Sequence, residues 1–142
     1  MKIKTLLTLL TTAALSLNVA LAADDDTPLA KEMKTMNKSL RALKKQVADA
    51  TKKDDNLALI ATIKKSLDAA AKLEPAKTKD VPAAEKAAYL DKYKAQMTDL
   101  AKTYDELEVA IKADKADDVK KALDKLADEK EKGHKDFAPD EK

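Results

Sequence analysis

The sequence has no cysteine, and this absence removes several kinds of chemistry at once. Without thiols the chain can form no disulfide, no thiolate metal site and no thioether bond to a cofactor. It also has a single histidine, His134, so no Ser/His/Asp or Cys/His arrangement is available for nucleophilic catalysis. The sequence therefore predicts a protein that is not an enzyme and that holds any ligand non-covalently.

Arginine is almost absent as well, occurring only as Arg41. Lys2 and Lys4 belong to the N-terminal segment described in the next paragraph. Without these two lysines the chain has 26 basic and 26 acidic side chains, so the formal net charge of the expected mature protein is zero. Because the lysines are interleaved with acids at helical spacing, we expect no polyanion-binding surface and no nucleic-acid partner.

The first 22 residues have the pattern of a secretory signal peptide. Lys2 and Lys4 precede an apolar run over residues 6–17, and Ala20-Leu21-Ala22 forms a small-x-small cleavage site. The apolar run is shorter than the roughly 20 residues that span a bilayer. We therefore expect cleavage after Ala22, export to the periplasm, no membrane insertion of the mature chain, and one domain over residues 23–142.

Glycine occurs once and proline four times, whereas Ala, Lys, Leu, Asp and Glu are abundant, which favours helices throughout. Four segments repeat apolar residues in steps of three and four. They start at Leu29, Leu57, Leu90 and Ala116 and end near Val47, Leu73, Ile111 and His134, with Phe137 beyond the last. Thr27-Pro28 is an N-cap with a first-turn proline. The sequence predicts an all-α fold, an antiparallel up-down-up-down four-helix bundle.

This connectivity brings both ends of the expected domain to one end of the bundle. The start of the first helix, the end of the second, the start of the third and the end of the fourth meet there. We expect this end to collect Met33, the small residues 69–71, Tyr93 with Met97, and His134. The alanines would leave space, and the larger side chains would form walls around it.

Two stretches carry a resemblance to a known family. Residues 28–43, with the pattern L-x-x-x-M-x-x-x-N-x-x-L, resemble the first helix of the soluble cytochrome b562 family, and K-A-L-D-K-L-A-D-E-K-E-K-G-H-K-D-F resembles its last helix. The resemblance implies a periplasmic electron-transfer protein with one b-type haem per chain. The resemblance also implies that Met33 and His134 are the axial ligands of the haem iron, that Tyr93 and Met97 are pocket walls, and that Lys130 contacts a haem propionate.

The departures from the family pattern also carry information. Where covalent relatives have C-x-x-C-H, this chain has Lys130-Glu131-Lys132-Gly133-His134, which indicates non-covalent haem b. Two protein ligands would leave no open site for oxygen, so electron transfer to unidentified redox partner proteins, by a monomeric chain, is the expected activity. Gly133, immediately before the histidine, would loosen the ligand segment.

Two alternatives from other classes stay open. Met33-x-x-Met36 places two thioethers one turn apart on a helix, and soft sulfur together with imidazole suits Cu(I), so a periplasmic copper-binding protein fits the same residues. A cofactor-free helical bundle that serves as an interaction module is the other alternative. Methionines at this spacing are also common in helix cores.

Overall fold

The computed structural model describes residues 27–139. The predicted leader and its cleavage after Ala22 lie outside the described residues. Within residues 27–139, no helix combines the length and the hydrophobicity needed to cross a membrane.

The first helix, α1, spans Pro28–Gln46 and begins as the sequence predicts. The hydroxyl oxygen of Thr27 accepts a hydrogen bond of 3.1 Å from the backbone N–H of Ala30, and Pro28 occupies the first helical position. The cap satisfies one of the backbone donors that a helix start leaves free. The buried side chains of α1 are Met36, Ser39, Leu40 and Leu43.

The second helix is shorter than predicted at its C-terminal end. It follows the 3-10 turn η2 (Ala50–Lys52), where the carboxylate of Asp49 accepts hydrogen bonds from the backbone N–H and the hydroxyl of Thr51. Helix α2 then spans Lys53–Ala70, and hydrogen-bonded turns carry the chain to Leu73. The segment before Pro75, predicted as helix, is therefore a turn.

The polar connection around residues 75–82 contains the 3-10 helix η3 (Ala76–Asp80). Helix α3 spans Lys86–Lys112 and helix α4 spans Ala116–Phe137. Between them Asp114 has a positive φ of 54°, a conformation that Asp tolerates better than most residues. Its carboxylate accepts a hydrogen bond of 2.8 Å from Lys53 Nζ, which connects this turn to the start of α2.

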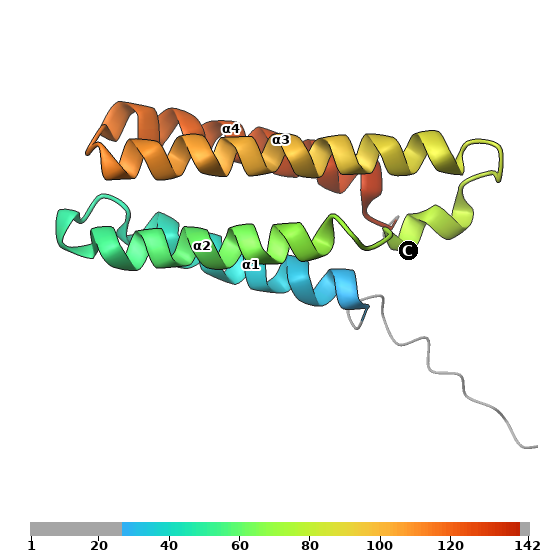
Figure 1. Ribbon diagram of the computed structural model, residues 1–142, viewed down its shortest axis with the longest axis horizontal. Helices are drawn as coiled ribbons and strands as arrows, with labels where there is room; N and C mark the ends of the chain where they lie inside the picture. Colours follow the sequence, from blue (N-terminus) through green and yellow to red (C-terminus); the bar gives the residue numbers. More distant parts are fainter. Residues whose placement is uncertain (1–26, 140–142) are drawn as a thin grey trace, which may run out of the picture.

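The four helices form the predicted antiparallel bundle, arranged as two helical hairpins in two layers (Figure 1). Close packing is greatest between α1 and α2 and between α3 and α4, and α2 with α3 joins the layers. Helices α1 and α4 are not among the closely packed pairs. One seam of the bundle is thus more open than the others, and the candidate site lies along it.

The core is mostly aliphatic and runs along the bundle axis. Its least exposed apolar members are Leu43, Ile60, Ile63, Ala70, Leu107, Tyr93 and Leu126. On the surface, Lys64 of α2 pairs with Asp105 and Glu108 of α3, which raises the pKa of the lysine through hydrogen bonds to both carboxylates. Exposed pairs of this kind contribute little to stability. The stability of the fold therefore comes mainly from the apolar core.

Candidate functional site: a cavity between the first and last helices

A cavity of about 370 Å³ lies at the end of the bundle where α1 starts and α4 ends. This volume is within the range of small-molecule and cofactor sites. The cavity is walled by α1, α3 and α4, by Leu67 of α2, and by Pro75 and Ala76 at the start of the α2–α3 connection. The five side chains that the sequence assigns to haem contacts line it: Met33, Tyr93, Met97, Lys130 and His134.

Two methionines reach the cavity from α1. Met36 is buried, with 8% of its surface exposed, whereas Met33, one turn earlier, is half-buried. Both side chains line the cavity because a spacing of three residues keeps them on one helical face. Met33 is the one closer to the open end of the bundle, where α4 brings its C-terminal turn.

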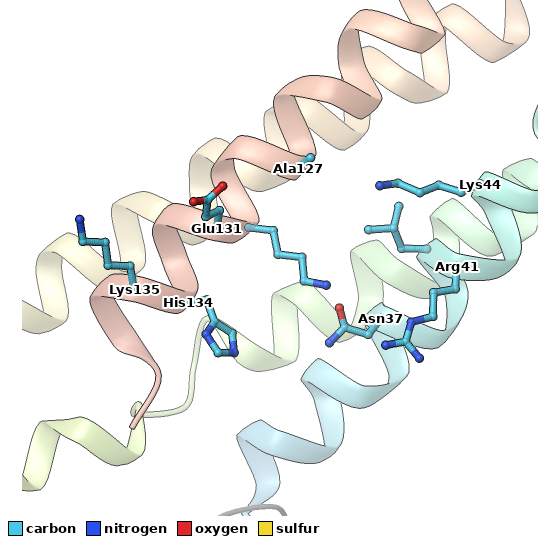
Figure 2. A pocket seen from close by; sticks show the side chains of 9 residues that line it. Asn37, Arg41, Lys44, Ala127, Glu131, His134 and Lys135 are labelled. Carbon is cyan, nitrogen blue, oxygen red and sulfur yellow. The ribbon is translucent and has the colours of Figure 1, made fainter. Parts of the chain in front are cut away.

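His134 belongs to the last turn of α4 and is exposed rather than buried. Its side chain leaves α4 on the side that faces α1 and points into the gap between the two helices (Figure 2). No hydrogen bond joins its imidazole to any other residue in the range 27–139, so both ring nitrogens are available to a ligand. The sequence places His134 on an apolar stripe, but the structure places it at the solvent edge of the cavity.

Gly133 does not open a loop beside the histidine. Helix α4 continues through it to Phe137, and the backbone N–H of Ala138 donates to the carbonyl oxygen of His134 at 3.0 Å. The ligand segment is a helical turn rather than a loop, since Gly133 is within a regular helix. His134 is therefore presented by a helix with a defined end.

The aromatic wall is larger than the sequence suggested. Phe137 is buried and lies with its ring centroid 5.3 Å from those of both Tyr89 and Tyr93, in edge-to-face geometry. Tyr93, Tyr104 and Phe137 all line the cavity. Burial raises the pKa of Tyr93 and of Tyr104 to about 12, so both hydroxyls stay neutral at physiological pH. A flat apolar ligand would meet aromatic side chains from α3 and α4.

A carboxylate that sequence reasoning missed, Glu129 of α4, also lines the cavity. Its Oε1 accepts a hydrogen bond of 2.9 Å from the hydroxyl of Thr103, a residue with no exposed surface. Its buried Oε2 has no hydrogen-bond partner among the described residues. A neighbouring backbone contact, from Gln96 Nε2 to the carbonyl oxygen of Glu129 at 3.0 Å, fixes this turn of α4 against α3. A buried acceptor without a partner costs free energy, which makes it a candidate functional group.

The expected space beside residues 69–71 is absent. Those residues do not line the cavity; Ala70 is fully buried, and its carbonyl oxygen accepts a hydrogen bond from the hydroxyl of Tyr93 at 2.8 Å. The reason is the early end of α2 at Ala70, after which the chain turns and presents Pro75 and Ala76 to the cavity. The opening comes from the separation of α1 and α4.

A shallow groove of about 630 Å³ adjoins the cavity on the outer side of the α1–α4 seam (Figure 2). It shares Asn37, Leu40, Lys130 and His134 with the cavity. Arg41 and Lys44 of α1 and Lys135 of α4 add further positive charge along it, and Glu131 is its one acidic residue. Any anionic group that projects from the cavity towards solvent would enter a basic environment.

Within residues 27–139, no three side chains of His, Asp or Glu come together as a metal site. The cavity is lined by one imidazole, from His134, and by three thioethers, from Met33, Met36 and Met97. Imidazole and thioether are ligands of haem iron. The apolar and aromatic walls, with a thioether on α1 and an imidazole on α4, fit a flat iron-containing macrocycle.

The site and the fold together define a four-helix bundle with a cofactor cavity between its first and last helices. A family model for cytochrome b562 matches residues 28–138, which include all four helices. The chain belongs to the cytochrome b562 family, whose members are haem-binding helical bundles that carry electrons and use b-type haem. No curated protein and no solved structure matches the chain significantly.

Proposed function

We propose that this chain is a periplasmic electron carrier that binds one haem b non-covalently, with Met33 and His134 as axial ligands. The observation that carries the proposal is the shared cavity: a thioether from α1 and a free imidazole from α4 line one apolar space. With no cysteine in the sequence, these residues must hold the haem without thioether bonds.

The bound haem would supply a one-electron Fe(III)/Fe(II) couple. The chain's own residues set the conditions for it. Met33 and His134 would occupy both axial positions, which excludes oxygen from the iron, and the neutral thioether favours the reduced state. Tyr93, Met97 and Phe137 would exclude water from the macrocycle. Because these side chains come from packed helices, they would need little reorganisation between the two redox states.

Lys130 would pair with a haem propionate. It lies on α4 one turn before His134 and lines both the cavity and the outer groove, so it stands where a propionate would reach solvent. Its ammonium group has no ion pair with another described residue. A propionate would provide the missing negative charge.

The visible spectrum of protein exported from cells supplied with haem tests the proposal. We expect a red protein with one haem per monomer, and resolved alpha and beta bands in the reduced form, as six-coordinate low-spin iron gives. Met33→Ala and His134→Ala should give weakly bound or high-spin haem. Met36→Ala is the matched control, because Met36 lines the same cavity one turn away, and it should keep the low-spin spectrum.

Three results would contradict this assignment. A colourless protein that takes up no added hemin would remove the haem function, and tight Cu(I) binding by that protein would favour the copper alternative. Loss of the low-spin spectrum in Met36→Ala but not in Met33→Ala would move the ligand by one turn. Retention of the leader after export would contradict cleavage after Ala22.

A further inference from the structure

Helix α1 carries the excess positive charge of the bundle. It has six lysine and arginine residues and one acid, Glu32. Helices α2 and α3 each have equal numbers of basic and acidic residues, and α4 has one more acid than base. The predicted interleaving of charges therefore holds for α2, α3 and α4, but it is wrong for α1. The net charge of zero conceals one strongly basic helix.

Four cations of α1 have no acidic partner among the described residues. Lys38, Arg41, Lys44 and Lys45 are exposed, and their side chains make no hydrogen bond or ion pair with any residue in the range 27–139. On other helices lysines are often paired, as Lys125 of α4 is with Glu106 of α3. A surface of unpaired cations retains its full attraction for an anionic partner.

The basic surface reaches the opening of the cofactor cavity. Arg41 and Lys44 line the outer groove from α1, and Lys130 and Lys135 line it from α4. His134 points into the same groove (Figure 2). The basic face consists of the following residues: Arg41, Lys44, Lys130, His134 and Lys135 along the groove, and Lys38 and Lys45 on the solvent side of α1. Two haem propionates would offset only part of its charge.

We propose that the basic face is the docking surface for a redox partner protein with an acidic surface. A partner held there covers the α1–α4 groove and stands next to the cofactor cavity, where the electron path between the two proteins is short. Complementary charge raises the rate of encounter and orients the partner before contact. The surface itself is present without haem, but its role in electron transfer rests on the proposed function.

A protein partner fits the basic face better than a lipid surface does. Peripheral membrane helices combine basic residues with apolar side chains that insert between headgroups. The apolar side chains of α1 face the core or the cavity. The one large apolar side chain exposed in the described part of the chain is Val109 on α3, away from the basic face. Nothing on this face would enter the bilayer.

The binding test uses a poly-glutamate peptide added to ¹⁵N-labelled protein, with and without haem. We expect chemical-shift changes confined to α1 and the C-terminal half of α4, and loss of binding at high salt. The double variant Lys38→Glu/Arg41→Glu should weaken binding about tenfold. The matched control, Lys65→Glu/Lys94→Glu, makes the same charge change at exposed, unpaired lysines of α2 and α3 and should change the affinity less than about twofold.

A kinetic test uses haem-loaded protein and two small oxidants of opposite charge. Oxidation by ferricyanide should slow as salt is added, and oxidation by tris(phenanthroline)cobalt(III) should accelerate. In Lys38→Glu/Arg41→Glu the ferricyanide rate should fall about tenfold while the cobalt rate rises. The control variant should keep both rates near those of the unmodified protein.

The outcomes separate this inference from the proposed function. Peptide binding at the basic face by a protein that takes up no haem would support the surface and remove only the cytochrome role. Equal losses in the two double variants would overturn the inference, because net charge rather than this face would then control binding. Sedimentation with phosphatidylglycerol vesicles without binding of the peptide would also overturn it, in favour of a lipid surface.

Discussion

The hydroxyl of Tyr93 on α3 donates a hydrogen bond of 2.8 Å to the backbone carbonyl oxygen of Ala70, the last residue of α2. Both residues are buried. The same carbonyl oxygen also accepts a hydrogen bond from the backbone N–H of Leu73 at 3.0 Å. Because carbonyl groups in the last turn of a helix lack the usual intrahelical partner, the two bonds together stabilise the end of α2 where the chain turns towards the cavity. Tyr93 thus has two roles, since its hydroxyl stabilises the end of α2 and the residue also lines the cavity.

Replacing Tyr93 with Phe should lower the free energy of unfolding by about 1 kcal/mol, the usual net worth of such a hydrogen bond. Urea unfolding at neutral pH measures the change. Tyr89→Phe is the matched control, because the Tyr89 hydroxyl makes only a long contact of 3.4 Å with the carbonyl oxygen of Asp136. An equal loss in both variants would show that the Tyr93 bond contributes nothing specific.

Alkaline pH should destabilise the bundle through Tyr93 and Tyr104. Burial raises both pKa values to about 12 in the folded protein, against about 10 in the unfolded chain. The folded state therefore holds these two protons more tightly. The stabilisation is complete below pH 10 and is lost between about pH 10 and 12, by up to about 1.4 kcal/mol per pH unit for each tyrosine.

Urea midpoints recorded from pH 9 to 12 measure this slope. Tyr93→Phe removes one of the two tyrosines whose pKa is raised to about 12, so the stability of this variant should fall less steeply with pH. The gap between the variant and the unmodified protein should narrow as pH rises. Parallel curves would mean that Tyr93 ionises equally easily in both states.

The sequence predicted the helices and placed Met33, Tyr93, Met97 and His134 at one end of the bundle, because apolar spacing and connectivity decide both. It did not predict Tyr89, which lies one position before the expected stripe at Leu90 but packs on Phe137. The rotation of a helix about its axis depends on the packing of its neighbours, and periodicity defines it only to about one residue. Residues 69–71 were misplaced because α2 ends early.

Glu129 could not have been found from its spacing, because its neighbours in sequence are charged and it reads as part of an exposed face. Only the contact with Thr103 across α3 and α4 shows that the carboxylate is turned inward. The same limit applied to Phe137, which the sequence placed beyond the last helix but which is its final residue.

Glu129→Gln should raise the reduction potential of the bound haem. A carboxylate at the cavity wall favours the more positively charged Fe(III) state, and the neutral amide removes that preference while it can still accept a hydrogen bond from Thr103. The expected shift is tens of millivolts, since about 59 mV corresponds to a tenfold change in equilibrium for one electron.

Redox titration measures the shift, and Glu131→Gln is the control. Glu131 is on the same helix and undergoes the same charge change, but it is exposed on the groove rather than in the cavity. Its effect should be smaller and should disappear in high salt. Equal shifts in the two variants would show that the buried position of Glu129 has no special influence on the iron.

Gly133→Ala should stabilise the protein without haem by up to about 1 kcal/mol, because glycine is the poorer helix former and this residue lies inside α4. A Cβ here would meet only the Gln96 side chain, at 3.9 Å, which is an ordinary van der Waals contact. Thermal and urea unfolding measure the gain. The control is Ala127→Gly, at an exposed site on the same helix, which should lower the free energy of unfolding by a similar amount.

Gly133 also lines the cavity, so hemin affinity is measured alongside. A stabilised variant with weaker hemin binding would show that the missing side chain leaves room for the cofactor, whereas a loss of stability would contradict the helical geometry described for this turn.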